Sequence, residues 1–154
     1  MKNDNFEIRN LTRDAIEELQ PLVKLFAQSH QSLPFADDYW QPFRKWLVNS
    51  ITDDDALCLT AELDRRIVAF ILGEIRDNVP IFSPEQIGHV SVLIVDDEKR
   101  LNGIGTSLWN AMREWFISRG MTRFELYTES GNDVSGPFWQ KRGFETFLKK
   151  RRFI

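Results

Sequence analysis

The chain has 154 residues, of which 42% are hydrophobic and 28% charged, a balance typical of one globular domain rather than a disordered chain. Its formal net charge of −3 argues against general nucleic-acid binding, which usually requires a basic footprint. Charged residues near the N-terminus argue against a signal peptide, no apolar run approaches the roughly 20 residues of a membrane span, and the single Cys58 is interpreted as a reduced core residue. We therefore expect one cytoplasmic domain over residues 1–154 that binds neither nucleic acid nor membrane.

The first third of the chain predicts a short strand and two helices. Residues 6–9 alternate in polarity, as a strand does. Thr12 is placed to cap a helix whose apolar residues recur at helical spacing as far as Phe26, and Pro21 is expected to kink or divide it. A second helix is expected from about Pro42 to Ser50. The aromatic and acidic stretch before it could line an acceptor pocket or only cover the core, and both interpretations stay open.

The middle of the chain predicts three strands. Ala56–Leu63 and Ile67–Ile75 are apolar runs joined by a three-residue turn, which indicates a hairpin. The loop Asp77–Gln86 leads to Gly88–Val95, which is aliphatic on both faces near its end. We expect this central strand to be covered on both sides of the sheet.

An amphipathic helix follows Gly105 and ends at the glycine stop Gly120. The next strand is Phe124–Thr128. A strand, a helix and a strand of these lengths predict a parallel pair joined by a right-handed crossover. A last strand is expected from Phe144 onward.

Two glycines stand where the helix after the central strand begins. Gly103 and Gly105 lack a Cβ, so a ligand can lie close to their backbone. The first helical turn also offers amide groups without internal partners at the positive end of the helix dipole. We therefore predict a site for phosphate or pyrophosphate. Neither a P-loop nor a dinucleotide fingerprint fits, because the required lysine and third glycine are missing.

The same turn carries a family signature. Arg100, Gly103 and Gly105 match the pattern Arg/Gln-x-x-Gly-x-Gly/Ala that follows a strand. In this motif the chain resembles the GNAT superfamily of acetyl-CoA-dependent N-acetyltransferases.

A second segment strengthens the resemblance. Asn132, Phe138, Gly143 and Phe144 fall into register with a GNAT segment in which Asn is followed seven residues later by Tyr, before a closing Gly-Phe. The order of expected elements also matches over essentially the whole chain. The resemblance implies an α/β fold with a six- to seven-stranded mixed sheet flanked by about four helices, in a single N-acetyltransferase domain.

The resemblance also implies where acetyl-CoA binds. Its pyrophosphate would lie on the amides after the central strand, and its pantetheine arm would pair with the strand itself. The implied coenzyme-binding residues are Leu93, Ile94, Val95, Arg100, Leu101, Asn102, Gly103, Ile104, Gly105, Thr106, Asn132, Trp139 and Lys141. The implied partners are acetyl-CoA and an amine acceptor without any metal, and a homodimeric assembly is left open.

Relatives transfer the acetyl group by direct attack of the amine, and many use the Tyr of the second segment to protonate the departing thiolate. Here that position is Trp139, whose indole can only donate a hydrogen bond. Tyr127, at the end of the neighbouring strand, is a substitute acid. The chain could therefore be an N-acetyltransferase, or a non-catalytic acyl-CoA-binding or protein-interaction domain that has lost its acid.

The expected general base is a histidine supported by a carboxylate. If the loop Asp77–Gln86 closes an antiparallel pair symmetrically, Glu74 stands opposite His89, with Ser91 two residues further on. The carboxylate would then raise the pKa of His89 and orient its ring. A register slip of one residue would instead separate the pair, and the two could also form no more than a surface contact.

Overall fold

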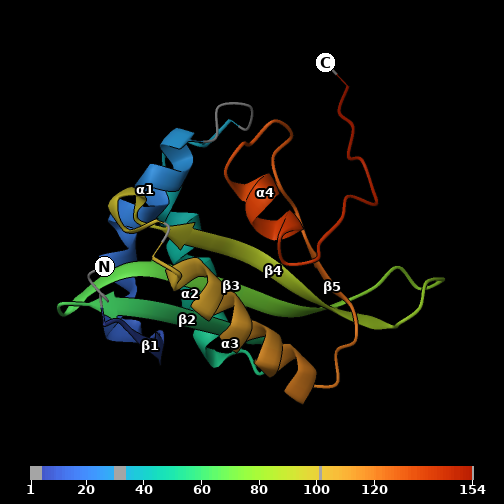
Figure 1. Cartoon of the computed structure of the whole chain (residues 1–154), viewed down its shortest axis with the longest axis horizontal. Helices are drawn as coiled ribbons and strands as arrows, with labels where there is room; N and C mark the ends of the chain where they lie inside the picture. Colours follow the sequence, from blue (N-terminus) through green and yellow to red (C-terminus); the bar gives the residue numbers. More distant parts are fainter. Residues whose placement is uncertain (1–4, 30–33, 101, 154) are drawn as a thin grey trace.

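The computed structural model describes residues 5–29, 34–100 and 102–153 (Figure 1). Its strands are β1 (Glu7–Asn10), β2 (Ala56–Leu63), β3 (Arg66–Asp77), β4 (Gln86–Val95) and β5 (Phe124–Leu126). Its α-helices are α1 (Gln20–Ser29), α2 (Trp40–Thr52), α3 (Ile104–Ser118) and α4 (Ser135–Gln140), and two 3-10 helices are η1 (Arg13–Leu19) and η2 (Asp97–Lys99). No helix within these ranges has the length and apolar character needed to cross a membrane.

The five strands form one mixed sheet in the order β1-β2-β3-β4-β5. The first four pair in antiparallel fashion, and β5 runs parallel to β4 because α3 carries the chain back across the sheet. The turn between β2 and β3 holds Asp64 and Arg65 at positive φ, as expected for a tight hairpin turn whose twist matches that of the strands.

Helices cover both faces of the sheet. On one face η1, α1 and α2 pack against Phe70, Leu72 and Ile94. On the other face α3 lies across the sheet (Figure 1), and its apolar side chains pack against the strands. Two strand glycines let α3 approach closely: a Cβ on Gly88 would stand 2.8 Å from the ring of Phe116. The central strand is therefore buried on both sides, as predicted.

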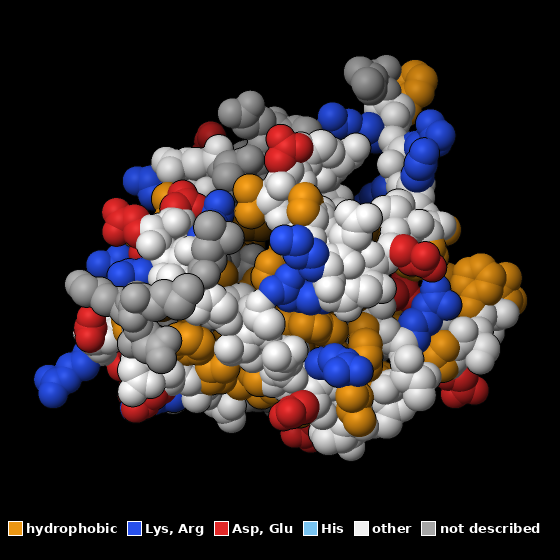
Figure 2. All heavy atoms as spheres, viewed as in Figure 1, with side chains coloured by type: hydrophobic (Ala, Val, Ile, Leu, Met, Phe, Trp, Pro, Cys, Tyr) orange, Lys and Arg blue, Asp and Glu red, His pale blue; other side chains and the backbone are white. Residues whose placement is uncertain are grey.

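The expected fold class is confirmed, and its strand count is corrected from six or seven to five over the part of the chain that the structure describes. The last strand predicted from Phe144 does not form, because residues 145–153 have no regular secondary structure. The four consecutive basic residues 149–152 give this segment no alternating apolar face to bury. Figure 2 shows it projecting from the body of the molecule, with basic side chains along it.

Several boundaries also move. The first helix is divided at Gln20, beside Pro21, into a 3-10 part and an α part. The second helix begins at Trp40 rather than Pro42, and β5 ends at Leu126 rather than Thr128. The early end of β5 places Tyr127 beyond the ladder, where the two parallel strands separate.

Candidate active site

The parallel strands β4 and β5 separate halfway along β4. Gly88, His89 and Val90 pair with β5. From Ser91 to Val95, none of the described residues pairs with the edge of β4 that faces β5. The other edge continues to pair with β3. The free edge therefore offers backbone N–H and C=O groups to an extended ligand rich in amides. Of its side chains, Leu93 and Val95 are half-buried and Ile94 is buried.

A β-bulge stands where the strands separate. Leu72 pairs with Val92 and Gly73 with Val90, so Ser91 is the additional residue on β4. Bulges bend a strand and redirect its side chains. Here the bulge brings the Ser91 hydroxyl toward Glu74 on β3 and toward His89 on its own strand.

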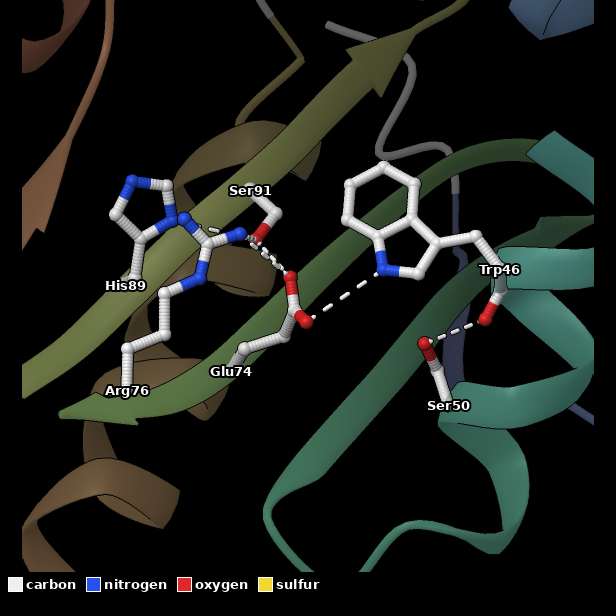
Figure 3. A network of polar contacts seen from close by, with 6 residues as sticks. All are labelled: Trp46, Ser50, Glu74, Arg76, His89 and Ser91. Carbon is white, nitrogen blue, oxygen red and sulfur yellow. Dashed lines mark hydrogen bonds and ion pairs between the residues drawn. The ribbon is translucent and has the colours of Figure 1, made fainter. Parts of the chain in front are cut away.

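Side chains from α2, β3 and β4 form a network of polar contacts at this point (Figure 3). The Ser91 hydroxyl donates to Glu74 Oε1 at 2.5 Å, and Arg76 Nη2 donates to the same oxygen at 2.9 Å. Arg76 Nη2 also lies 3.2 Å from Ser91 Oγ, and Trp46 Nε1 of α2 reaches the other carboxylate oxygen at 3.5 Å. Glu74 stands opposite His89 in the ladder, which confirms the predicted register.

The hydrogen-bond network indicates which ring nitrogen of His89 carries the hydrogen. A hydroxyl has one hydrogen, and the Ser91 hydrogen is directed at the Glu74 carboxylate. In the 3.2 Å hydrogen bond between His89 Nδ1 and Ser91 Oγ, the Nδ1–H group of the imidazole must then be the donor. The neutral ring therefore carries its lone pair on Nε2, which is buried and without a hydrogen-bond partner among the described residues.

The electrostatics correct one expectation about this pair. Burial, together with the Arg76 guanidinium, lowers the pKa of His89 to about 4, and the Glu74 carboxylate opposes this only in part. Burial acts to raise the pKa of Glu74, but hydrogen bonds from Ser91 and Arg76 keep it below its usual value. The imidazole is therefore neutral and the carboxylate ionised at neutral pH.

Tyr127 lies beside the histidine. Its ring centroid is 5.2 Å from that of His89, and the ring is 78% exposed. The ammonium of Lys150, on the C-terminal segment, lies 5.9 Å from the tyrosine ring centroid. The structure thus brings all three expected catalytic residues, His89, Glu74 and Tyr127, to the point where the strands separate.

The two glycines after β4 have different surroundings. Gly103 precedes α3 with φ of +78°, and a Cβ there would meet no atom within 4 Å. The first turn of α3 is therefore open to a ligand on that side. A Cβ on Gly105 would lie 3.2 Å from the ring of Phe138, so this glycine allows α4 to approach α3. Leu101, between Arg100 and Asn102, lies outside the described residues.

Other expected contacts have structural roles. Asn132 Oδ1 accepts hydrogen bonds from the backbone N–H groups of Val134 and Ser135 at 3.0 and 2.9 Å, and so orders the turn that leads into α4. Trp139 is only 6% exposed and packs edge-on against Trp109 in the core. Its indole lies in this aromatic cluster, away from the polar network.

The basic side chain that contacts the first turn of α3 is Arg142, not the expected Lys141. Lys141 is exposed, whereas its neighbour Arg142 donates a hydrogen bond to Thr106 Oγ1. Arg100 forms an ion pair with Asp97 at 2.7 Å. The sequence analysis missed Arg142, although two adjacent basic residues before the Gly-Phe pair were a visible signal.

The remaining expected residues contribute through their backbone or are exposed. Ile104 is buried in the core, so only its backbone can reach a ligand, and Asn102 is exposed. Across residues 5–29, 34–100 and 102–153 no three His, Cys, Asp or Glu side chains are grouped as a metal site.

Comparison with known proteins places this geometry in a family. Residues 16–144 match the model of the acetyltransferase (GNAT) family. An uncharacterized N-acetyltransferase of Methanocaldococcus jannaschii is 24% identical over 141 residues, which are 91% of this chain and 61% of that relative. The chain thus spans about three fifths of that relative's length.

Two solved structures with coenzyme share the fold. The aminoglycoside N-acetyltransferase AAC(6')-Iy, in complex with CoA, superposes with a TM-score of 0.78 at 20% identity, covering 97% of this chain and 94% of the other. A predicted acetyltransferase of Clostridium acetobutylicum with acetyl-CoA superposes with a TM-score of 0.83 at 16% identity, covering 97% of this chain and 96% of the other. With the family model matching most of its length, the chain belongs to the acetyltransferase (GNAT) family.

Proposed function

We propose that this protein is an N-acetyltransferase that transfers an acetyl group from acetyl-CoA to a primary amine of a small molecule or protein, by direct attack and without a covalent intermediate. The single observation that carries the proposal is the buried ring nitrogen His89 Nε2, which has no hydrogen-bond partner among the described residues and lies beside the point where β4 and β5 separate. A thiol-release assay with acetyl-CoA and a panel of amines and peptides tests it. No release above background with any acceptor would contradict it.

The chain's own groups fit the coenzyme. The free edge of β4 at Leu93–Val95 supports pairing with the amide-containing arm, and the open turn at Gly103 supports binding of the diphosphate. Acetyl-CoA, when bound, supplies an activated thioester. A backbone N–H of the same free edge can donate to the oxygen on which negative charge develops.

We assign the general base to His89, with Glu74 as a positioning residue that acts through Ser91. An imidazole with a pKa of about 4 cannot deprotonate a free ammonium, whose pKa is roughly 10.4. The acceptor must therefore bind as the neutral amine. Once the C–N bond has formed, the nitrogen becomes far more acidic, and His89 Nε2 can then accept its proton.

We assign proton donation to the departing sulfur to Tyr127. It lies against His89 and is well exposed, so its hydroxyl is not committed to the core. Its phenol O–H can donate a hydrogen bond to the sulfur, on which negative charge develops as the carbon–sulfur bond breaks, and can pass its proton to that sulfur. The family's usual position cannot supply this acid, because the indole of Trp139 is not an acid and is also buried.

The burial of Trp139 also favours the second candidate, a non-catalytic acyl-CoA-binding or protein-interaction domain. Trp139→Phe separates a chemical role from a structural one, because phenylalanine keeps the apolar ring and removes the N–H. We expect thiol release within a few-fold of wild type in the steady-state assay, together with a lower melting temperature from the lost packing. A loss of roughly a hundredfold would show that the indole takes part in the chemistry.

We propose that residues 1–154 contain one catalytic domain, that the protein is cytoplasmic and that it forms a homodimer. The buried thiol of Cys58, whose pKa burial raises to about 12, suits a reducing compartment. The C-terminal segment exposes Phe147 and Leu148, which a second copy of the chain could cover. Light scattering should give a dimer for the wild type and a monomer for Phe147→Ser with Leu148→Ser; a monomeric wild type would refute the assembly.

A further inference from the structure

Arg142 holds a charge at the start of α3 that none of the described carboxylates neutralises. Its guanidinium lies 3.5 Å from the ring centroid of Phe138, and its Nη1 donates to the Phe138 carbonyl oxygen at 2.6 Å. Its Nη2 donates to the hydroxyl of Thr106, in the first turn of α3. All of these partners are neutral.

A counter-charge is missing around this guanidinium. Among the residues that the structure describes, no carboxylate lies within ion-pair distance of Arg142. Its Nε is buried without a hydrogen-bond partner, and burial lowers the pKa of the side chain. The beginning of an α-helix is itself the positive end of the helix dipole. Two positive groups thus face one another, an arrangement that a bound anion would stabilise.

The local packing holds the guanidinium in this position. Phe138 lies in the last turn of α4 and Arg142 in the turn just beyond it, four residues later, so their side chains can stack. Phe138 in turn lies against Gly105, where a Cβ would be 3.2 Å from the ring. The small residue at position 105 lets α4 approach α3, and this approach delivers Arg142 to Thr106.

From this we propose that Arg142 is the side chain that closes the α3 anion site over the diphosphate of coenzyme A. The inference rests on the proposed coenzyme binding and adds a residue to it. The guanidinium would keep its stacking on Phe138 and turn its Nη2 from Thr106 to a phosphate oxygen, forming a charge-assisted hydrogen bond.

The test is calorimetric titration of the intact protein with coenzyme A and, separately, with pantetheine, which has no phosphate. We expect Arg142→Gln to weaken coenzyme A binding by about 10- to 100-fold, as for loss of a charged hydrogen bond, and to leave pantetheine affinity unchanged. Arg142→Lys, which retains the charge without the planar fork, should lie in between. Lys24→Gln, at an exposed position of α1, is the control for the loss of one positive charge and should bind as the wild type does.

A second phosphate must be distinguished from the diphosphate. Arg142 also lines a cavity of about 260 Å³ with Arg113 and Trp109 of α3, where the 3′-phosphate of the coenzyme could reach both guanidinium groups. The proposal requires that Arg142→Gln weaken the binding of 3′-dephospho-coenzyme A by the same factor as it weakens the binding of coenzyme A. If the loss disappears with that ligand, or Arg113→Gln reproduces it, Arg142 serves the 3′-phosphate and the assignment to the diphosphate is wrong.

Failure of this inference is distinct from failure of the proposed function. A wild-type protein that binds no coenzyme A would refute both. A wild-type protein that binds it, with Arg142→Gln equally tight and equally stable in thermal melting, would refute the role of Arg142 alone.

Discussion

His89→Gln is expected to lower kcat by roughly 100-fold or more, the scale of a missing general base, with coenzyme affinity unchanged. Glutamine has a similar size and can still donate to Ser91, but it has no basic nitrogen at the position of His89 Nε2. Steady-state thiol release gives kcat, and calorimetry gives the coenzyme affinity. A variant with wild-type kcat would remove His89 as the base.

The pH profile sharpens this test. Because the pKa of His89 is lowered to about 4, its imidazole is neutral above that pH, and activity should be lost to its protonation only as the pH falls toward 4. Between pH 6 and 9, kcat/KM should instead rise with the neutral fraction of the acceptor amine. Glu74→Gln should change kcat and the acidic limb together. An acidic limb that is identical to wild type in both variants would contradict the proposed pair.

The same shift predicts an effect on stability. A histidine with a lower pKa in the folded state than in the unfolded state binds protons preferentially when unfolded. The free energy of unfolding should therefore fall as the pH drops from about 6.5 through about 4. His89→Gln removes the group responsible, so its unfolding free energy should depend less on pH in that window.

Gly103→Val is expected to abolish coenzyme binding while the protein stays folded. The native φ of +78° is unfavourable for a β-branched residue, and a side chain there would project into the open approach to α3. Calorimetric titration with coenzyme A should show no binding, and circular dichroism should keep the wild-type helix signal.

Gly120→Val is the matched control. Gly120 also has a positive φ, of +82°, and open space around its Cβ position, but it lies beyond the other end of α3. The control should show comparable destabilisation in thermal melting and normal coenzyme affinity. If both variants bound coenzyme A equally well, the turn at Gly103 would not be the anion site.

The sequence by itself determined the elements that follow from local patterns. Alternation, helical spacing and turn residues predicted the four antiparallel strands and α3, and a count outward from the loop Asp77–Gln86 placed Glu74 opposite His89. These predictions succeeded because side-chain period and turn geometry are properties of neighbouring residues. The glycine turn at Gly103 was readable for the same reason.

Only the tertiary structure decided the chemistry around those elements. The bulge at Ser91 and the early end of β5 depend on how strands pair across the sheet. The pKa of His89 fell rather than rose because burial and the charge of Arg76 together outweigh one carboxylate. Such a balance is a sum over neighbours from separate strands, which a linear pattern does not contain.

In the second family segment, from Asn132 to Phe144, the sequence likewise determined one part and the tertiary structure the other. Its spacing matched the family segment, but the spacing alone did not say which side chain would face the coenzyme. Helix packing buried Trp139 among aromatic rings, left Lys141 in solvent and directed Arg142 to α3. The direction of each side chain follows from how closely α4 can approach Gly105, a contact between residues more than 30 positions apart in the chain.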